Sequence, residues 1–311
     1  MALDRGFGFV ARVVVAPLLA CLGACSSGSG TAGTPPPNEP GPYAIASYDT
    51  SFTDASGTFV STIVHPDTSD GSPYPIVSVA PGTCSIREWY TWVGEQLASH
   101  GYVVLTFTPP APCFGGPFAV ANGLVEALDF LVDESARADA PIFGRVDGER
   151  RAIVGHSLGA IAVLIAASEH PEIDAAVPLA AGPLTSSYLD KITTPTLLLA
   201  ASEDGIVPAE GAVTAYERLT NAPKELVTIA GGNHVGFCTL GSICDVAGGL
   251  LDDPRALDEP GRQDELMRKY TTAWLERFLR GRRAYDAYLT GAEAEADLDA
   301  GLLTELRADL E

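Results

Sequence analysis

The sequence has little positive charge. It contains 19 lysine and arginine residues against 40 aspartate and glutamate residues, which gives a formal net charge of −21. Proteins that recognise nucleic acids need basic side chains for their phosphate contacts, so nucleic-acid recognition is excluded as the main function. Charged residues make up only 19% of the 311 residues and apolar residues 46%. Most of the chain therefore has enough apolar material to fold around a core.

Cysteine is also scarce, and no two of the six cysteines form a Cys-x-x-Cys pair. This spacing excludes a dense disulfide framework and supports no metal site. If the chain is exported, the four cysteines of its body, Cys84, Cys113, Cys238 and Cys244, can form two disulfides. Cys238 and Cys244 enclose only five residues and are the easier pair. The alternative is that all four are unpaired, buried thiols.

The chain has no long apolar run at its start, but residues 1–25 have the pattern of an export signal. Arg5 and Arg12 precede a short apolar segment, residues 13–20. This segment is interrupted by Pro17 and is too short for a durable membrane span.

Small residues then precede Cys25, as in the lipobox of bacterial lipoproteins, and Cys21 also fits that pattern. We expect Cys25 to be the lipidated residue, because a serine- and glycine-rich stretch follows it directly. An ordinary secretory signal is the alternative, and both interpretations predict export. Residues 26–42 show no apolar period and are expected to form a flexible linker.

From Tyr43 onward, short apolar segments alternate with amphipathic ones. Strands are expected at residues 58–64, 75–80, 102–107, 151–154, 175–179, 196–200 and 225–229. Helices are expected at residues 89–100, 119–132 and 158–168. This alternation predicts an α/β fold, in which helices cover both faces of a mostly parallel sheet. We expect one domain over residues 43–289 and an acidic tail over residues 290–311 that forms a solvated helix.

The most specific motif is Gly155-His156-Ser157-Leu158-Gly159, which lies between an expected strand and an apolar helix. This Gly-x-Ser-x-Gly pattern in that context predicts a nucleophile elbow. Ser157 would take a strained backbone conformation that exposes its hydroxyl, and the flanking glycines would let strand and helix approach closely.

A serine hydroxyl needs a base, and in the fold of the nucleophile elbow the acid and then the histidine follow the serine. Of the five histidines, only His170 and His234 follow Ser157. His170 ends a helix, whereas His234 follows the last expected strand through a glycine-rich loop, where the general base belongs. Structural roles are expected for His65, His100 and His156.

Asp204 is the candidate for the acid that orients His234, because it precedes Gly205 in the loop after the strand at 196–200. Glu203 is the competing residue, and Asp190 is more distant. For the oxyanion hole we expect the backbone N–H groups of Leu158 and Thr83, the latter in the loop after the strand at 75–80.

Five segments, in this order, carry a resemblance to a known family: Leu97–Val104, Arg145–Asp147 leading into Gly155–Gly159, Pro195–Leu199 with Glu203 and Asp204, Ala273–Leu279, and Tyr285–Leu289. Together they resemble the α/β-hydrolases of the bacterial cutinase and polyester-hydrolase group, near the dienelactone-hydrolase-like esterases. The resemblance covers residues from about 45 to 290. It implies a carboxyl-ester hydrolase with a Ser157–Asp204–His234 triad and no cofactor.

The chain departs from that family at several positions. The position of Thr83 is usually aromatic there, Leu158 replaces a usual methionine, and residues 180–183 lack a tryptophan that helps to clamp an aromatic polymer unit. We therefore expect a small or aliphatic ester as substrate. Residues 236–263 form a longer segment than in the family, and we expect it to shape the substrate entrance. The stretch between Leu179 and Thr196 is too short for a lipase-type helical lid.

These observations predict an exported, lipid-anchored serine esterase whose membrane association depends on the anchor alone. Its partner would be a small or polymeric ester. An amidase or peptidase on the same fold is the rival within the class, and a surface-anchored binding protein without catalysis is the rival from another class.

Overall fold

The computed structural model describes residues 35–238 and 261–311. The chain divides after Gly33, and the unit Thr34–Glu311 holds every element named below. Several predictions lie outside the described residues: the export signal, Cys21, Cys25, most of the linker, Cys244 and most of the segment at 236–263. Among the described residues, no helix is both long enough and apolar enough to cross a membrane.

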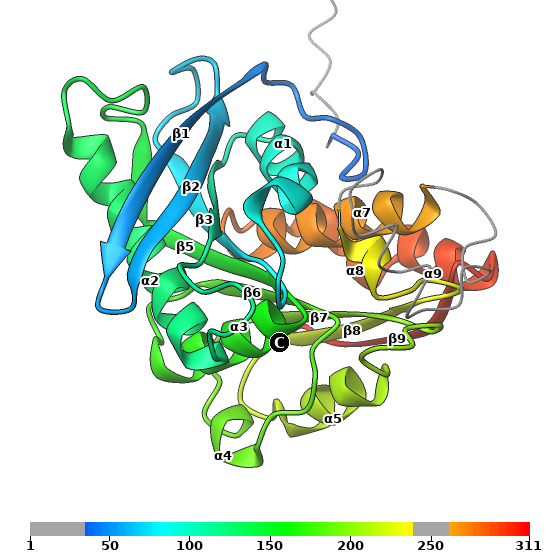
Figure 1. Ribbon diagram of the computed structural model, residues 1–311. Helices are drawn as coiled ribbons and strands as arrows, with labels where there is room; N and C mark the ends of the chain where they lie inside the picture. Colours follow the sequence, from blue (N-terminus) through cyan, green and yellow to red (C-terminus); the bar gives the residue numbers. More distant parts are fainter. Residues whose placement is uncertain (1–34, 239–260) are drawn as a thin grey trace, which may run out of the picture. The chain divides into compact units, whose positions relative to one another are not determined.

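A single sheet of nine strands runs through the described part of the chain, in the order β1-β2-β4-β3-β5-β6-β7-β8-β9 (Figure 1). The strands are β1 Ile45–Asp54, β2 Gly57–Pro66, β3 Tyr74–Ala80, β4 Val103–Thr108, β5 Val146–His156, β6 Ala175–Leu179, β7 Thr196–Ala201, β8 Lys224–Ile229 and β9 Leu303–Asp309. All pairings from β4 through β8 are parallel, and β1, β2 and β9 pair antiparallel at the two edges. The predicted mostly parallel sheet is confirmed.

Helices cover both faces of this sheet. The α-helices are α1 Thr91–Ser99, α2 Pro117–Ala136, α3 Leu158–Glu169, α4 Ser186–Leu189, α5 Glu210–Arg218, α7 Arg262–Phe278, α8 Asp286–Leu289 and α9 Ala292–Asp299. The described residues also form three 3-10 helices: η1 Arg87–Tyr90, η2 Val235–Phe237 and η3 Arg283–Tyr285. Between β6 and β7 the chain forms only the four-residue α4, so this connection carries no helical lid.

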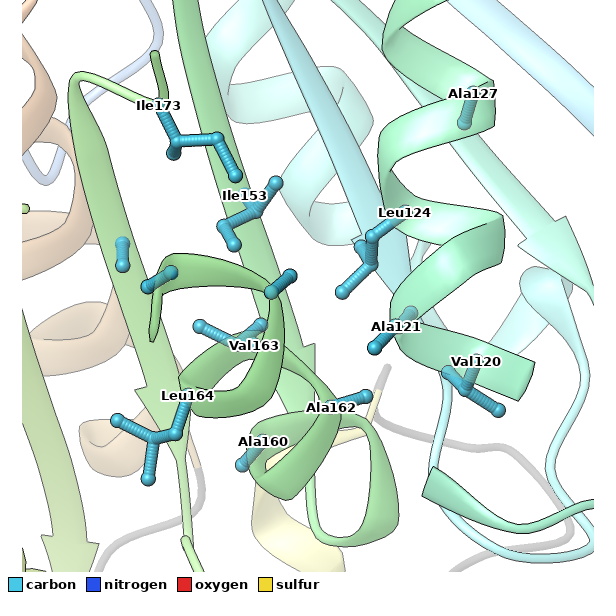
Figure 2. Close-up of a cluster of buried hydrophobic side chains, with 14 of the residues drawn as sticks. Val120, Ala121, Leu124, Ala127, Ile153, Ala160, Ala162, Val163, Leu164 and Ile173 are labelled. Atoms are coloured by element: carbon cyan, nitrogen blue, oxygen red, sulfur yellow. The ribbon is translucent and has the colours of Figure 1, made fainter. Parts of the chain in front are cut away.

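Two buried apolar clusters form the core, one on each face of the sheet. The first packs α2, α3 and α5 against the sheet, and Figure 2 shows its centre, where Leu124 of α2 and Val163 of α3 lie near Ile153 of β5. The second packs α1 and α7 against the opposite face. Because both faces of the parallel strands are covered, those strands are continuous apolar runs, as the sequence shows.

The C-terminal segment corrects one prediction. Residues 290–311 were expected to form a solvated tail helix beyond the domain, and the strand at 225–229 was expected to be the last. Instead α9 is followed by β9, which pairs antiparallel with β8 from Lys224 to Ile229. Leu303 is buried in the second cluster. The segment is therefore an integral edge of the sheet.

Candidate active site

Ser157 occupies the sharp turn between β5 and α3. Its φ of 57° lies in the left-handed region that non-glycine residues avoid, and its N–H donates to the Leu179 carbonyl (2.9 Å). A Cβ on Gly159 would lie 2.6 Å from the Ala80 carbonyl oxygen, and one on Gly155 would clash with the carbonyl of Gly159. Only glycine therefore allows α3 to cross so close to the strand ends, which holds the strained turn in place.

His234 and Asp204 meet at the ends of neighbouring strands. His234 Nδ1 lies 2.8 Å from Asp204 Oδ2, and both side chains are buried. The other carboxylate oxygen, Oδ1, accepts the N–H groups of Ile206 (2.9 Å) and Val207 (2.6 Å). An acceptor-only carboxylate at Nδ1 selects the tautomer that carries its proton there, which makes Nε2 the basic nitrogen.

The two competing acids are placed elsewhere. Glu203 is exposed, and its backbone N–H donates to the Gly232 carbonyl. Asp190 is an exposed residue at the end of α4, within 4.0 Å of Arg218. Of the three acids, Asp204 is the one in contact with His234.

Ser157 and His234 line the same pocket, which has a volume of about 260 Å³. Its walls come from the loop after β3, from η1, from the elbow and from the loops after β7 and β8. The lining residues are Gly82, Thr83, Ser85, Trp89, His156, Ser157, Ile206, His234, Val235 and Cys238. The triad candidates, which lie far apart in the sequence, are thus brought together.

Both candidate oxyanion donors are near this pocket. Leu158 is the first residue of α3, directly after Ser157, and Thr83 lines the pocket from the loop after β3. Within the described residues, no hydrogen bond uses the backbone N–H of either one. The N–H groups of a helix N-terminus and of a loop next to a serine are of the kind that can donate to a developing negative charge.

His156 was expected only to pack away from the hydroxyl, but it lines the pocket beside Ser157. Its ring centre lies 4.5 Å from that of His234, and its Nδ1 lies 2.9 Å from the Tyr90 hydroxyl. Burial lowers the pKa of the His156 imidazole well below its usual range, and the nearby His234 lowers it further. His156 is therefore expected to be neutral beside His234.

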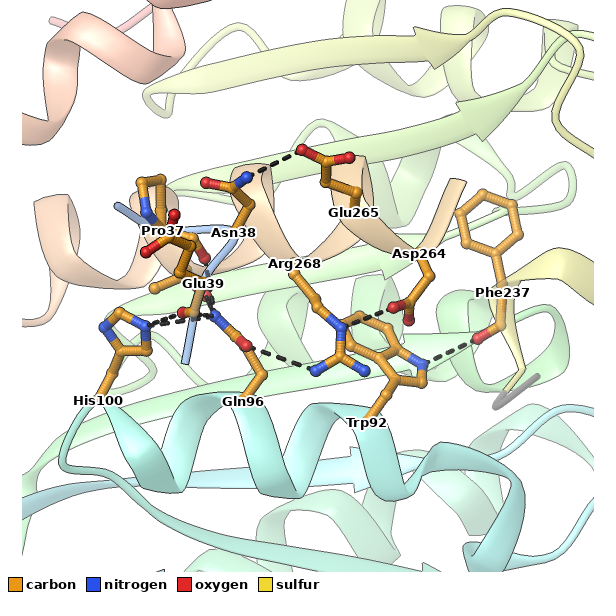
Figure 3. A network of polar contacts seen from close by, with 11 residues as sticks. Pro37, Asn38, Glu39, Trp92, Gln96, His100, Phe237, Asp264, Glu265 and Arg268 are labelled. Atoms are coloured by element: carbon orange, nitrogen blue, oxygen red, sulfur yellow. Dashed lines mark hydrogen bonds and ion pairs between the residues drawn. The ribbon is translucent and has the colours of Figure 1, made fainter. Parts of the chain in front are cut away.

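The turn after His234 is anchored to α1. Trp92 donates its indole N–H to the Phe237 carbonyl (3.1 Å), as Figure 3 shows. In the same layer Arg268 of α7 contacts both Asp264 and the side-chain oxygen of Gln96, which ties α7 to α1. These contacts fix the loop that carries His234 to the helical layer behind it.

Sequence reasoning missed Trp89 and Tyr90. Trp89 was expected to begin a helix over residues 89–100, but it lies in η1, where it is half-buried and lines the pocket. The periodicity could not show this, because α1 begins two residues later at Thr91.

A disulfide joins Cys84 and Cys113, which confirms that the body of the chain contains a disulfide. The pairing of Cys238 with Cys244 stays a prediction, because Cys244 lies outside the described residues. Among the residues that the structure describes, no group of three or more histidine, cysteine or acidic side chains is placed to hold a metal ion.

A family model of PET hydrolase-like proteins matches residues 37–305. The chain is 29% identical over 251 residues to Cutinase 1 of Thermobifida cellulosilytica, which covers 80% of this chain and 84% of that protein. It is 29% identical over 251 residues to a cutinase of Thermobifida fusca, and the match covers 80% of this chain and 73% of that cutinase. It is 28% identical over 251 residues to a bis(hydroxyethyl) terephthalate hydrolase of Streptomyces coelicolor, and the match covers 80% of this chain and 71% of that hydrolase.

Proposed function

The chain belongs to the PET hydrolase-like family of serine ester hydrolases, and we propose that Ser157, His234 and Asp204 carry its chemistry. One observation supports this assignment above all. The imidazole that is oriented by Asp204 lines the same pocket as the hydroxyl of the strained elbow. Among the described residues, the one other histidine that lines that pocket is His156, and burial lowers the pKa of its imidazole, which makes it a weaker base.

In the proposed reaction Ser157 Oγ attacks the ester carbonyl while His234 Nε2 takes the hydroxyl proton. The N–H groups of Leu158 and Thr83 donate to the oxyanion of the tetrahedral intermediate. His234 then protonates the departing alcohol, and a water molecule activated by the same nitrogen releases the acyl group from Ser157.

Asp204 holds the imidazole of His234 in one orientation through this cycle. Two backbone N–H groups donate to its Oδ1, which fixes the carboxylate so that Oδ2 faces Nδ1 of His234. The negative charge next to Nδ1 stabilises the imidazolium that forms when His234 takes the proton.

We propose a small or aliphatic ester as the substrate. Thr83 presents a hydroxyl where the related enzymes usually have an aromatic ring, and residues 180–183 supply no tryptophan. Trp89, Ile206 and Val235 leave an apolar pocket with one aromatic wall, which suits one acyl unit better than a stacked aromatic polymer unit. The relatives named as cutinases and as a bis(hydroxyethyl) terephthalate hydrolase support ester hydrolysis in general.

We also propose that the protein is exported and anchored through Cys25, with Cys21 as the alternative site. The Cys84–Cys113 disulfide supports export, because such bonds persist in oxidising compartments. Mass spectrometry of the mature N-terminus would identify a lipidated cysteine, and Cys25→Ser should then move the protein from the membrane fraction to the soluble one.

The proposed triad is tested with p-nitrophenyl butyrate and purified variants. Ser157→Ala and His234→Ala should each lower kcat by at least about 10³-fold, and Asp204→Asn should lower it by about 10³- to 10⁴-fold. Ser168→Ala is a matched control, because its hydroxyl, also on α3, only donates to the Ile165 carbonyl. Activity of Ser157→Ala equal to that of the unmodified protein would refute the assignment. A matched anilide substrate separates esterase from amidase activity.

A further inference from the structure

The loop that carries Thr83 is fastened on both sides by groups that the proposed reaction does not use. On the inner side, the N–H of Gly82 donates to the Tyr90 hydroxyl oxygen (3.0 Å). On the outer side, Cys84 is joined to Cys113 and its N–H donates to the Pro112 carbonyl (2.7 Å). Thr83 therefore has a fixed neighbour in each direction along the chain.

The inner contact connects the loop to the general base. Tyr90 is 1% exposed in the second cluster, so its hydroxyl is held within the core. Its oxygen accepts the Gly82 N–H, and the same hydroxyl shares a hydrogen bond with His156 Nδ1, 2.9 Å away. The His156 ring lies in turn against the ring of His234. One buried hydroxyl thus bridges the oxyanion loop and the histidine that packs on the base.

The outer contact holds a backbone conformation that would otherwise relax. Cys84 has a φ of 56°, in the left-handed region, where a residue with a Cβ is stable only if its surroundings impose it. The segment around Cys113, to which Cys84 is joined, is a tight turn. In it the N–H groups of Phe114 and Gly115 both donate to the Ala111 carbonyl. The disulfide anchors Cys84 to this turn.

We propose that the Tyr90 hydroxyl and the Cys84–Cys113 disulfide are positioning groups, which hold the Thr83 N–H at the place where the ester oxyanion develops. This inference rests on the proposed function, because it assumes that Ser157 is the nucleophile. Tyr90, Cys84 and Cys113 are not among the described residues that line the pocket of Ser157, so they would act through the backbone of residues 82–84. An oxyanion donor is effective only when it is fixed before the charge forms, and a displacement of about 1 Å is enough to lower the rate strongly.

Tyr90→Phe tests the inner contact, because it keeps the ring in the core and removes only the hydroxyl. We expect kcat to fall roughly ten- to a hundred-fold with KM changed less than about twofold, since the loss acts on the transition state. A trifluoromethyl ketone forms an oxyanion on the active serine, so its inhibition constant should rise by the same factor. Tyr285→Phe is the matched control, because that hydroxyl donates to the Pro35 carbonyl, away from the site, and its removal should leave kcat unchanged.

The double variant Cys84→Ser/Cys113→Ser tests the outer contact in the same assays. Rates are normalised to the concentration of reactive serine, titrated with a fluorophosphonate, so that unfolded protein does not count. A lower kcat with weaker ketone inhibition in either variant supports the proposal. A lower melting temperature with unchanged kcat and ketone inhibition in both variants would overturn it. Ser157→Ala separates the two proposals: if it is inactive while Tyr90→Phe and the double variant are fully active, only the positioning role fails.

Discussion

At the scale of single residues, Trp89 determines the shape of the pocket. It is the only tryptophan, phenylalanine or tyrosine among the described residues that line the pocket of Ser157. Its indole is half-buried against the second cluster, so its orientation is fixed by packing. Ile206 and Val235 complete the apolar part of the wall. We therefore expect a bulky acyl group held in this pocket to contact the indole ring.

We predict that Trp89→Leu changes substrate preference more than it changes the rate for the smallest ester. Loss of the indole removes apolar contact area that only a bulky acyl group reaches. The kcat/KM for p-nitrophenyl benzoate should fall about tenfold relative to that for p-nitrophenyl acetate. Ile86→Ala, a change at an exposed residue near η1, should leave this ratio unchanged. An unaltered ratio in Trp89→Leu would show that the acyl group binds elsewhere.

The residues that could be predicted from the sequence are those at the ends of apolar strands. Ser157 directly follows β5, whereas Asp204 and His234 lie in the loops after β7 and β8. The carboxyl ends of parallel strands meet at one edge of a sheet. Tyr90 and Trp89 lie instead in a short 3-10 helix, whose side-chain directions depend on how the loop after β3 packs. Local periodicity contains no such information.

At the scale of secondary-structure elements, the edge strands of the sheet differ from the central strands in how apolar and how buried they are. The central strands are apolar on both faces, and the sequence identifies them. The edge strands β1 and β9 are half-exposed and mostly polar, so they have no continuous apolar run to reveal them. In β9, Leu303 contacts the core while the residues after it are mostly exposed, which is why this segment resembles a solvated tail in the sequence.

Two leucines of the C-terminal segment distinguish an integral strand from a tail. Leu303 is 4% exposed in β9, whereas Leu298 of α9 is 43% exposed. Leu303→Ala should lower the free energy of unfolding by about 2–3 kcal/mol, because it leaves a cavity in the second cluster. Leu298→Ala should change it by less than about 0.5 kcal/mol. Urea unfolding monitored by tryptophan fluorescence measures both values, and equal effects would mean that β9 does not pack as described.

At the scale of the whole molecule, the chain carries a large excess of negative charge. It nevertheless buries the carboxyl group of Glu225. Glu225 lies in β8 with no exposed surface, and neither of its carboxyl oxygens has a hydrogen-bond partner among the described residues. Its neighbours in the second cluster include Tyr270 of α7, whose pKa it helps to raise. Burial raises the pKa of Glu225 well above its usual range, because an ionised carboxylate without partners is costly in an apolar interior.

This carboxyl group makes the stability of the fold depend on pH. The folded-state pKa of Glu225 is raised above the unfolded value, so the folded chain binds its proton more tightly. The stabilisation is complete below the unfolded pKa and is lost as the pH rises through the folded one. Glu225→Gln cannot ionise, so its melting temperature relative to the unmodified protein should rise steadily from acidic to alkaline pH. Glu149→Gln, at an exposed carboxylate, should show no such trend in the same thermal scans, and a difference that is constant with pH in Glu225→Gln would mean that this carboxyl group is charged in the folded protein.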